Sequence, residues 1–192
     1  MGKERLTAFT DGVVAIIITI MVLELKLPHG ARMSDLTPVI PVFLAYLLSF
    51  IYVGIYWNNH HHMLQLAESV NGPILWANLH LLFWLSLIPF ATTWVGENHL
   101  APVPVALYGG LLILVAIAYT ILMTLLVRHE GPESALAQAM GRDLKGKLSL
   151  VIYAAGVGLA FVQPFAAIAC YVLVAVIWFI PDQRVERVIQ AP

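Results

Sequence analysis

A charged and polar segment stands directly before the first apolar run of the chain, where Arg5, Phe9, Thr10 and Asp11 supply a guanidinium, an aromatic ring, a hydroxyl and a carboxylate. On one helix Arg5 and Asp11 are separated by about 240°, at roughly 100° per residue, so they cannot pair with each other. An ionised group at the centre of a bilayer costs about 2.5–3.5 kcal/mol unless it is paired or hydrated. The two charges are therefore either interfacial anchors that reach the headgroups or groups with partners on neighbouring helices.

The composition indicates a membrane protein. Of 192 residues, 60% are hydrophobic and 11% are charged, against roughly 25% charged in an average soluble domain. The formal net charge is −1, so the chain lacks the excess of positive charge that is typical of nucleic-acid-binding proteins. The first apolar run carries Asp11 and Glu24 and lacks a small-residue cleavage site, so we expect it to be a retained span rather than a signal peptide. The single cysteine, Cys170, can form no internal disulfide.

Apolar stretches of about 20 residues predict membrane-spanning helices, because a hydrocarbon core of about 30 Å needs that length at 1.5 Å per residue. Proline, glycine and polar residues separate these stretches, and Gln163-Pro164 divides the last one. The prediction is an all-α integral membrane protein with one domain over residues 1–192. Its six spans are at about 10–27, 38–60, 74–95, 105–127, 148–163 and 165–180. Residues 128–147 form the longest loop, with room for a short amphipathic helix around 133–140.

The distribution of positive charge favours six spans over five. With six spans and a cytosolic amino terminus, eight Lys and Arg residues lie inside: Lys3, Arg5, Arg128, Arg142, Lys145, Lys147, Arg184 and Arg187. Only Lys26 and Arg32 then lie outside, whereas five spans would give six residues against four. The positive-inside rule therefore predicts that both termini are cytoplasmic.

The motifs of soluble enzymes are absent from the sequence. It contains no G-x-x-x-x-G-K-[ST], no H-E-x-x-H, no C-x-x-C and no G-x-S-x-G, so phosphate loops, zinc sites and nucleophile elbows lack their minimum parts. Three consecutive histidines, His60, His61 and His62, point about 100° apart on a helix and cannot converge on one metal as an i, i+4 pair could. We expect polar residues at a helix end, or partners for the charges of the first helix.

The predicted topology places two further polar residues near Arg5, Thr10 and Asp11. If the second span ends and the third begins on the cytosolic side, His60 and Asn78 lie at the same membrane depth as those three residues. A side-chain amide buried in lipid needs a partner. The five residues are therefore candidates for one network between helices, whose role is structural or functional.

One stripe of the first span has the spacing i, i+3, i+4, i+7, and it comprises Ile16, Thr19, Ile20 and Leu23. In an isolated helix such a stripe faces lipid or a neighbouring helix. Several copies around an axis would instead turn Ile16 and Leu23 into apolar rings that gate by dewetting, with a ring of Thr19 hydroxyls between them.

These residues resemble a known family. Arg5-Leu6-Thr7-Ala8-Phe9-Thr10-Asp11 looks like the R-x-x-x-F-S-D signature of the transmembrane protein 175 family of lysosomal potassium channels and their short prokaryotic relatives, with threonine in place of serine. The similarity continues at further positions: Ile16, Thr19, Val22-Leu23-Glu24-Leu25, Trp57-Asn58-Asn59-His60, Asn78 and Pro89-Phe90. It covers about the first half of the chain with specific motifs, and the six-span layout also matches.

The resemblance implies a cation channel without the T-V-G-Y-G loop of the usual potassium channels, and this sequence has no such loop. Prokaryotic members with one six-helix unit assemble as homotetramers in which the first helix lines the pore. By this resemblance Ile16 is the apolar constriction, Ile20 and Leu23 also face the pore, and Thr19 forms the hydroxyl layer implicated in potassium preference.

The resemblance also gives the signature residues a role. Arg5 and Asp11 are expected to join a network with His60 and Asn78, and the signature includes Phe9, Thr10 and Trp57 as well. Because prokaryotic members are the less selective ones, we expect only modest preference for potassium over sodium.

The sequence therefore predicts a homotetrameric potassium-permeable channel in a bacterial-type plasma membrane. It predicts no enzyme activity, no cofactor, no small-molecule substrate and no nucleic-acid partner, with a potassium ion passing transiently near Thr19. The alternative is a proton-coupled transporter in which Asp11 and His60 form a relay. A membrane scaffold without transport comes third, and an intramembrane enzyme last, because nothing in the spacing supports a substrate cavity.

Overall fold

The computed structural model describes residues 2–140 and 143–179, and in these ranges the chain is all-helical. The helices follow the chain in this order: α1 (Glu4–Leu23), the 3-10 helix η1 (Met33–Val39), α2 (Ile40–Leu66), α3 (Gly72–Ser86), α4 (Ile88–Glu97), α5 (Pro102–Glu130), α6 (Ala135–Met140), α7 (Leu144–Leu159) and α8 (Pro164–Phe179).

The first two long helices have different ends from those expected. α1 begins at Glu4 rather than near residue 10, so the whole polar signature is helical, and it ends at Leu23 rather than Leu27. α2 continues to Leu66, six residues beyond the predicted end at 60, so His61 and His62 lie inside the helix. Asn58 and Asn59 do not stop it, because a short polar run without Gly or Pro only weakly opposes a long helix.

The predicted third span consists of two helices. Pro89 has no N–H and its ring clashes with the carbonyl four residues earlier, so the helix breaks between Ser86 and Ile88 and restarts as α4. Asn71 caps the start of α3 by accepting a hydrogen bond from the Ile74 N–H at 3.1 Å. The two helices together cover residues 72–97, where the sequence predicted 74–95.

The second half of the chain forms α5 to α8. α5 is longer than its predicted range of 105–127 and ends before Gly131, whose φ of 95° suits glycine. The loop expected at 128–147 is partly helical, with α6 inside the range proposed for a short helix. α7 begins at Leu144, four residues before the expected 148, because Asp143 caps it by accepting from the Gly146 N–H at 3.0 Å. α8 begins at Pro164, and the predicted end at Ile180 lies outside the described residues.

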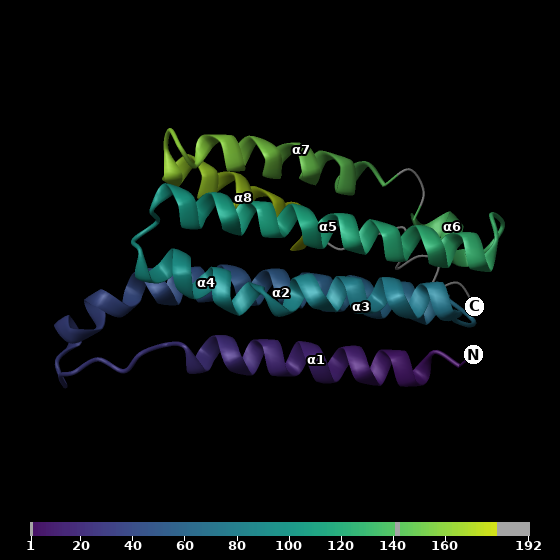
Figure 1. Ribbon diagram of the computed structural model, residues 1–192, viewed down its shortest axis with the longest axis horizontal. Helices are drawn as coiled ribbons and strands as arrows, with labels where there is room; N and C mark the ends of the chain where they lie inside the picture. Colours follow the sequence, from purple (N-terminus) through teal and green to yellow (C-terminus); the bar gives the residue numbers. More distant parts are fainter. Residues whose placement is uncertain (1, 141–142, 180–192) are drawn as a thin grey trace.

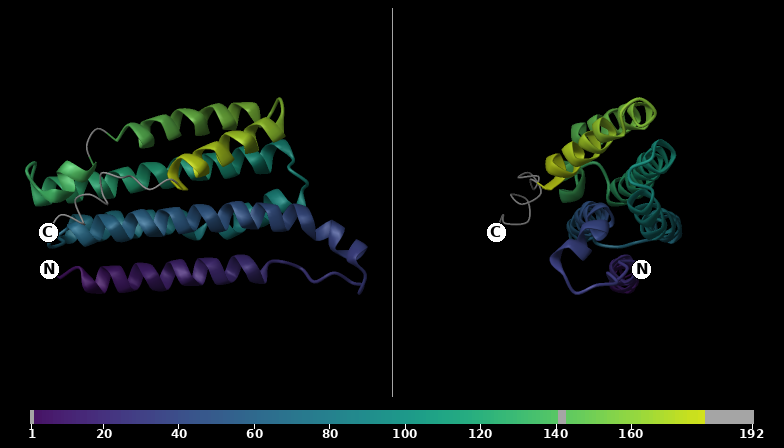
Figure 2. Two further views of the ribbon diagram at one scale, coloured as in Figure 1. Left: turned by 180° about the vertical axis from the view of Figure 1, so that it is seen from behind. Right: turned by 90° about the vertical axis from the view of Figure 1, so that its left-hand side faces the viewer.

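The long helices run roughly side by side, with α1 at one edge of the bundle (Figure 1). Viewed end-on, α1 lies apart from α7 and α8, which stand on the opposite side (Figure 2). α1 contacts α2, α3 and α4, whereas α5 packs against α3 and α7. The outer position of α1 leaves one of its faces uncovered by the other described helices.

Within residues 2–140 and 143–179, four helical stretches are long and apolar enough to cross a membrane: Glu4–Leu23, Met33–Leu66, Gly72–Glu97 and Pro102–Glu130. α8 is a shorter apolar helix of 16 residues, and α7 has the same length. At 1.5 Å per residue each of these two helices is about 24 Å long, somewhat shorter than a typical hydrocarbon core.

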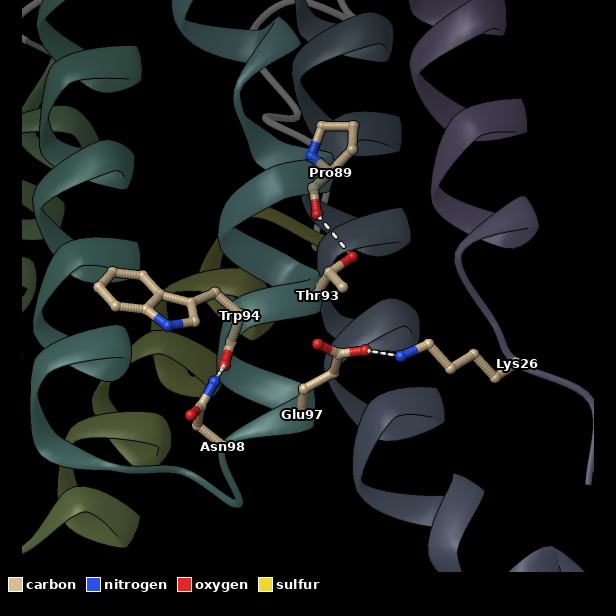
Figure 3. A network of polar contacts seen from close by, with 6 residues as sticks. All are labelled: Lys26, Pro89, Thr93, Trp94, Glu97 and Asn98. Carbon is tan, nitrogen blue, oxygen red and sulfur yellow. Dashed lines mark hydrogen bonds and ion pairs between the residues drawn. The ribbon is translucent and has the colours of Figure 1, made fainter.

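An exposed ion pair connects the segment that follows α1 to the end of α4. The Lys26 ammonium contacts the Glu97 carboxylate at the end of α4, where Thr93 and Asn98 hydrogen-bond to carbonyls of their own helix (Figure 3). Glu97 raises the pKa of Lys26 above its ordinary value. The contribution of the pair to stability is therefore complete at neutral pH and is lost as the pH rises through that raised value.

Candidate functional site

The two faces of α1 have different surroundings. Leu6, Thr10, Val14, Ile17 and Met21 are buried against the rest of the chain. These positions repeat every three or four residues, so they form one stripe on the helix. The candidate pore residues Ile16, Thr19, Ile20 and Leu23 all lie on the other, exposed face.

The exposed face of α1 is apolar in composition. Ile16 is 59% exposed and Leu23 is 76% exposed, which is unusual for residues of this size. The Thr19 hydroxyl donates to the Ala15 carbonyl at 2.8 Å, so its proton is used inside the helix and its oxygen lone pairs remain available. Such a face needs either lipid or other protein chains to cover it.

A buried chain of hydrogen bonds holds the opposite face of α1. The Asn78 amide nitrogen donates to the Thr10 hydroxyl at 2.9 Å, and the Asn78 amide oxygen lies 2.8 Å from His60 Nε2. Because that oxygen can only accept, His60 Nε2 carries the proton. All three residues are at most 3% exposed, so the bonds join α1, α2 and α3 where water cannot replace them.

Asp11 has a partner on α2. The Trp57 indole N–H donates to the Asp11 carboxylate at 2.8 Å, and His61 stacks on Trp57 with the ring centres 6.0 Å apart. The structure thus gives Asp11 the partner on another helix that its own helix cannot supply. Arg5 and Phe9 are exposed, and Arg5 has no hydrogen-bond or ion-pair partner among the described residues.

The expected network is therefore divided in the structure. Thr10, Asn78 and His60 form one buried group, Asp11 and Trp57 form a second group at the surface, and Arg5 joins neither. The three consecutive histidines also separate, because His60 contacts Asn78, His61 stacks on Trp57, and the His62 ring lies 5.8 Å from that of His61.

Sequence analysis missed two further contacts of this region. The Lys3 ammonium donates to the backbone carbonyls of Gln65 at 3.0 Å and Ala67 at 2.5 Å, which connects the start of α1 to the end of α2. Ser49 on α2 is hydrogen-bonded to Thr92 at 2.6 Å and to Tyr108 at 2.9 Å, so it joins α4 and α5. The Ser49 contacts could have been expected from the sequence, because a lone Ser or Thr in an apolar span needs a hydrogen-bond partner on another helix.

The fold and this helix define an all-α membrane protein whose first helix exposes an apolar face. The model of the family "Endosomal/lysosomal potassium channel TMEM175" matches residues 5–89. A potassium channel of Chryseobacterium sp. (strain P1-3) is 58% identical over 187 residues, which cover 97% of each chain. The chain therefore belongs to the TMEM175 family, and the resemblance seen in its sequence is confirmed.

Other relatives agree with this assignment. A potassium channel of Streptomyces collinus is 30% identical over 89% of this chain and 88% of its own. The crystal structure of a lysosomal potassium-selective channel TMEM175 homologue from Chamaesiphon minutus superposes with a TM-score of 0.82 at 25% identity, covering 94% of this chain and 97% of that one. The human endosomal/lysosomal proton channel TMEM175 is 36% identical, but the match covers only 19% of that protein. The family consists of ion channels, which confirms that the chain is not an enzyme.

Proposed function

We propose that this protein is a potassium-permeable channel that conducts cations passively along a pore lined by α1. The observation that carries the proposal is the exposed apolar stripe on α1, which none of the other described helices covers. The bacterial relatives at 58% and 30% identity are potassium channels, and the structural neighbour is a potassium-selective channel. No cofactor is needed, and potassium is the permeant ion.

The proposed assembly is a homotetramer of six-helix subunits. Each subunit is one membrane domain whose α3 and α4 together form one span, with α7 and α8 as the last two spans. Four copies of α1 around an axis would cover the exposed stripe, because its residues would face their counterparts. Both termini are placed in the cytoplasm of a bacterial-type cell by the positive-inside count. Of the residues in that count, Arg142, Arg184 and Arg187 lie outside the described residues.

The proposed pore has its narrowest ring at Ile16, with Ile20 and Leu23 as further apolar rings. Isoleucine has no oxygen to replace the hydration water of an ion, so this ring gates by dewetting. Discrimination between potassium and sodium then depends on pore width, partial dehydration and the Thr19 oxygens near which the ion passes. We therefore propose modest selectivity.

The signature residues are proposed to position the pore helix rather than to conduct. Asn78 fixes Thr10 and Trp57 fixes Asp11, so the two contacts set the rotation of α1 about its axis. Arg5 and Phe9 lie beside these contacts on the uncovered side of α1, where a second copy of the chain would meet them.

The proposal is tested by ion flux into proteoliposomes that contain the purified protein. A channel gives potassium flux that follows the potassium gradient, does not saturate, and needs no pH gradient. The alternative, a proton-coupled transporter using Asp11 and His60, gives saturable uptake that requires a pH gradient and loses this coupling in Asp11→Asn. Uptake with those properties would overturn the channel proposal.

A further inference from the structure

A small cavity lies inside the subunit, away from α1. Its described walls come from α2, α5, the start of α7 and the end of α8. The space open to the centre of a water molecule is about 30 Å³, whereas a single water needs roughly 10–15 Å³ by that measure. The cavity therefore has room for more than one water molecule, or for one small ligand.

Aromatic rings form much of the wall. Tyr56, Tyr119, Tyr153 and Trp178 all line the cavity. The rings of Tyr56 and Tyr119 meet edge to face, with their centres 5.9 Å apart. The Trp178 indole is held in place because its N–H donates to the Ser149 hydroxyl at 2.8 Å. The faces of such fixed rings attract cations through their quadrupoles.

One hydroxyl of the cavity wall has no hydrogen-bond partner among the described residues, although it is not sealed off from solvent. Tyr119 is only 8% exposed, yet its hydroxyl makes no hydrogen bond to any described residue. The described residues contain no side-chain oxygen that is both fully buried and unpaired, so this hydroxyl is within reach of a water molecule or a small ligand. A molecule that enters the cavity can therefore bond to the Tyr119 oxygen.

The remaining polar groups of the wall favour a positive charge. Asp143 lines the cavity with a carboxylate that is fixed by its bond to the Gly146 N–H. The Asn59 amide nitrogen donates to the Ile55 carbonyl at 2.8 Å, which leaves its oxygen as an acceptor. An ammonium group supplies the donors that these oxygens lack, and its alkyl part suits a wall that is mostly apolar. A bare metal ion would need more oxygen ligands.

We propose that this cavity binds a small organic ammonium ion of about the size of methylammonium. The N–H groups donate to Asp143 and to the Tyr119 hydroxyl, while the methyl group packs against Tyr56 and Trp178. The site does not depend on the proposed function, since its described walls contain no residue of the pore helix.

The test is calorimetric titration of the full-length protein in detergent micelles with methylammonium chloride, with sodium chloride as the reference salt. Wild type should give saturable heat. Asp143→Asn keeps a helix-capping side chain but removes the charge, so it should lose about tenfold or more in affinity because a charged hydrogen bond is lost. Tyr119→Phe should also weaken binding. Thermal unfolding of each variant shows that it remains folded.

Two controls separate this site from the pore. Ile16→Asn should bind methylammonium as well as wild type does, and Asp143→Asn should conduct potassium as wild type does. The proposal is overturned if wild type gives no saturable heat, which would mean that the cavity holds only water. It is equally overturned if Ile16→Asn abolishes binding while Asp143→Asn keeps it, because the ligand would then be in the pore.

Discussion

Asn78 is the side chain on which the position of α1 depends most directly. It is 2% exposed and uses both ends of its amide, one toward Thr10 and one toward His60. Its removal would leave two buried polar groups without partners, which is more costly than the loss of the bonds themselves.

Asn78→Ala should therefore lower stability by about 1–3 kcal/mol, the cost of leaving a buried donor or acceptor unpaired. The measurement is the thermal unfolding midpoint of the protein in detergent. Asn98→Ala is the matched control, because Asn98 is exposed and bonds only to the Trp94 carbonyl of its own helix. Equal midpoints for the two variants would show that the buried chain of bonds does not hold α1.

Sequence reasoning identified most of these residues but not all of their pairings. Topology alone placed His60, Asn78 and Thr10 at one depth, and they are bonded in the structure. It could not place Arg5, because the rotation of α1 decides which side chains face inward. That rotation follows from the packing of α1 against α2 and α3, and the sequence of α1 by itself does not determine this packing.

Close contact between α2 and α4 depends on one glycine. A Cβ added at Gly96 would lie 2.7 Å from the Val42 Cα, so the backbone of α2 would have to move. Nothing lies within 4 Å of the corresponding point at Gly110 on α5. The two glycines therefore have different roles, although both lie in helices of predicted membrane spans.

Gly96→Ala should lower the unfolding midpoint, because overpacking of a tight contact typically costs about 1–3 kcal/mol. Gly110→Ala should leave it unchanged or raise it slightly, since alanine is favoured over glycine in a helix by roughly 0.5–1 kcal/mol. The measurement is the thermal unfolding midpoint of both variants and wild type in the same detergent. A Gly96→Ala protein as stable as wild type would mean that α2 and α4 are not in close contact.

The long helices could be predicted from hydropathy, but their ends could not. The sequence indicated the division at Gln163-Pro164, but one unbroken span was predicted at 74–95, where Pro89 separates α3 from α4. It did not indicate that α1 starts at Glu4 or that α2 runs on to Leu66. Helices continue past the apolar run where polar side chains find partners, as Lys3 does on two carbonyls at the end of α2.

In the proposed channel, four copies of the chain surround one pore. In the proposed tetramer Leu23 faces other copies, whereas Met21, two residues away, is only 2% exposed and packs within its own subunit. The chain has one native cysteine, Cys170. Its replacement by serine gives a background in which single cysteines report on the interface.

In that background Leu23→Cys should form covalent dimers with a short bismaleimide crosslinker, and Met21→Cys should not. Native mass spectrometry of the untreated protein should count four copies. A monomer by mass, or crosslinking of Met21→Cys alone, would contradict the proposed arrangement of α1.

The central claim is that ions pass along α1 with Ile16 as the narrowest ring. The most direct measurement compares potassium and sodium flux into proteoliposomes for wild type and Ile16→Asn in matched preparations. Because asparagine hydrates the apolar ring, the variant should carry more potassium than wild type and should discriminate less against sodium. Unchanged or abolished flux in a folded, tetrameric Ile16→Asn protein would contradict the claim that this helix lines the pore.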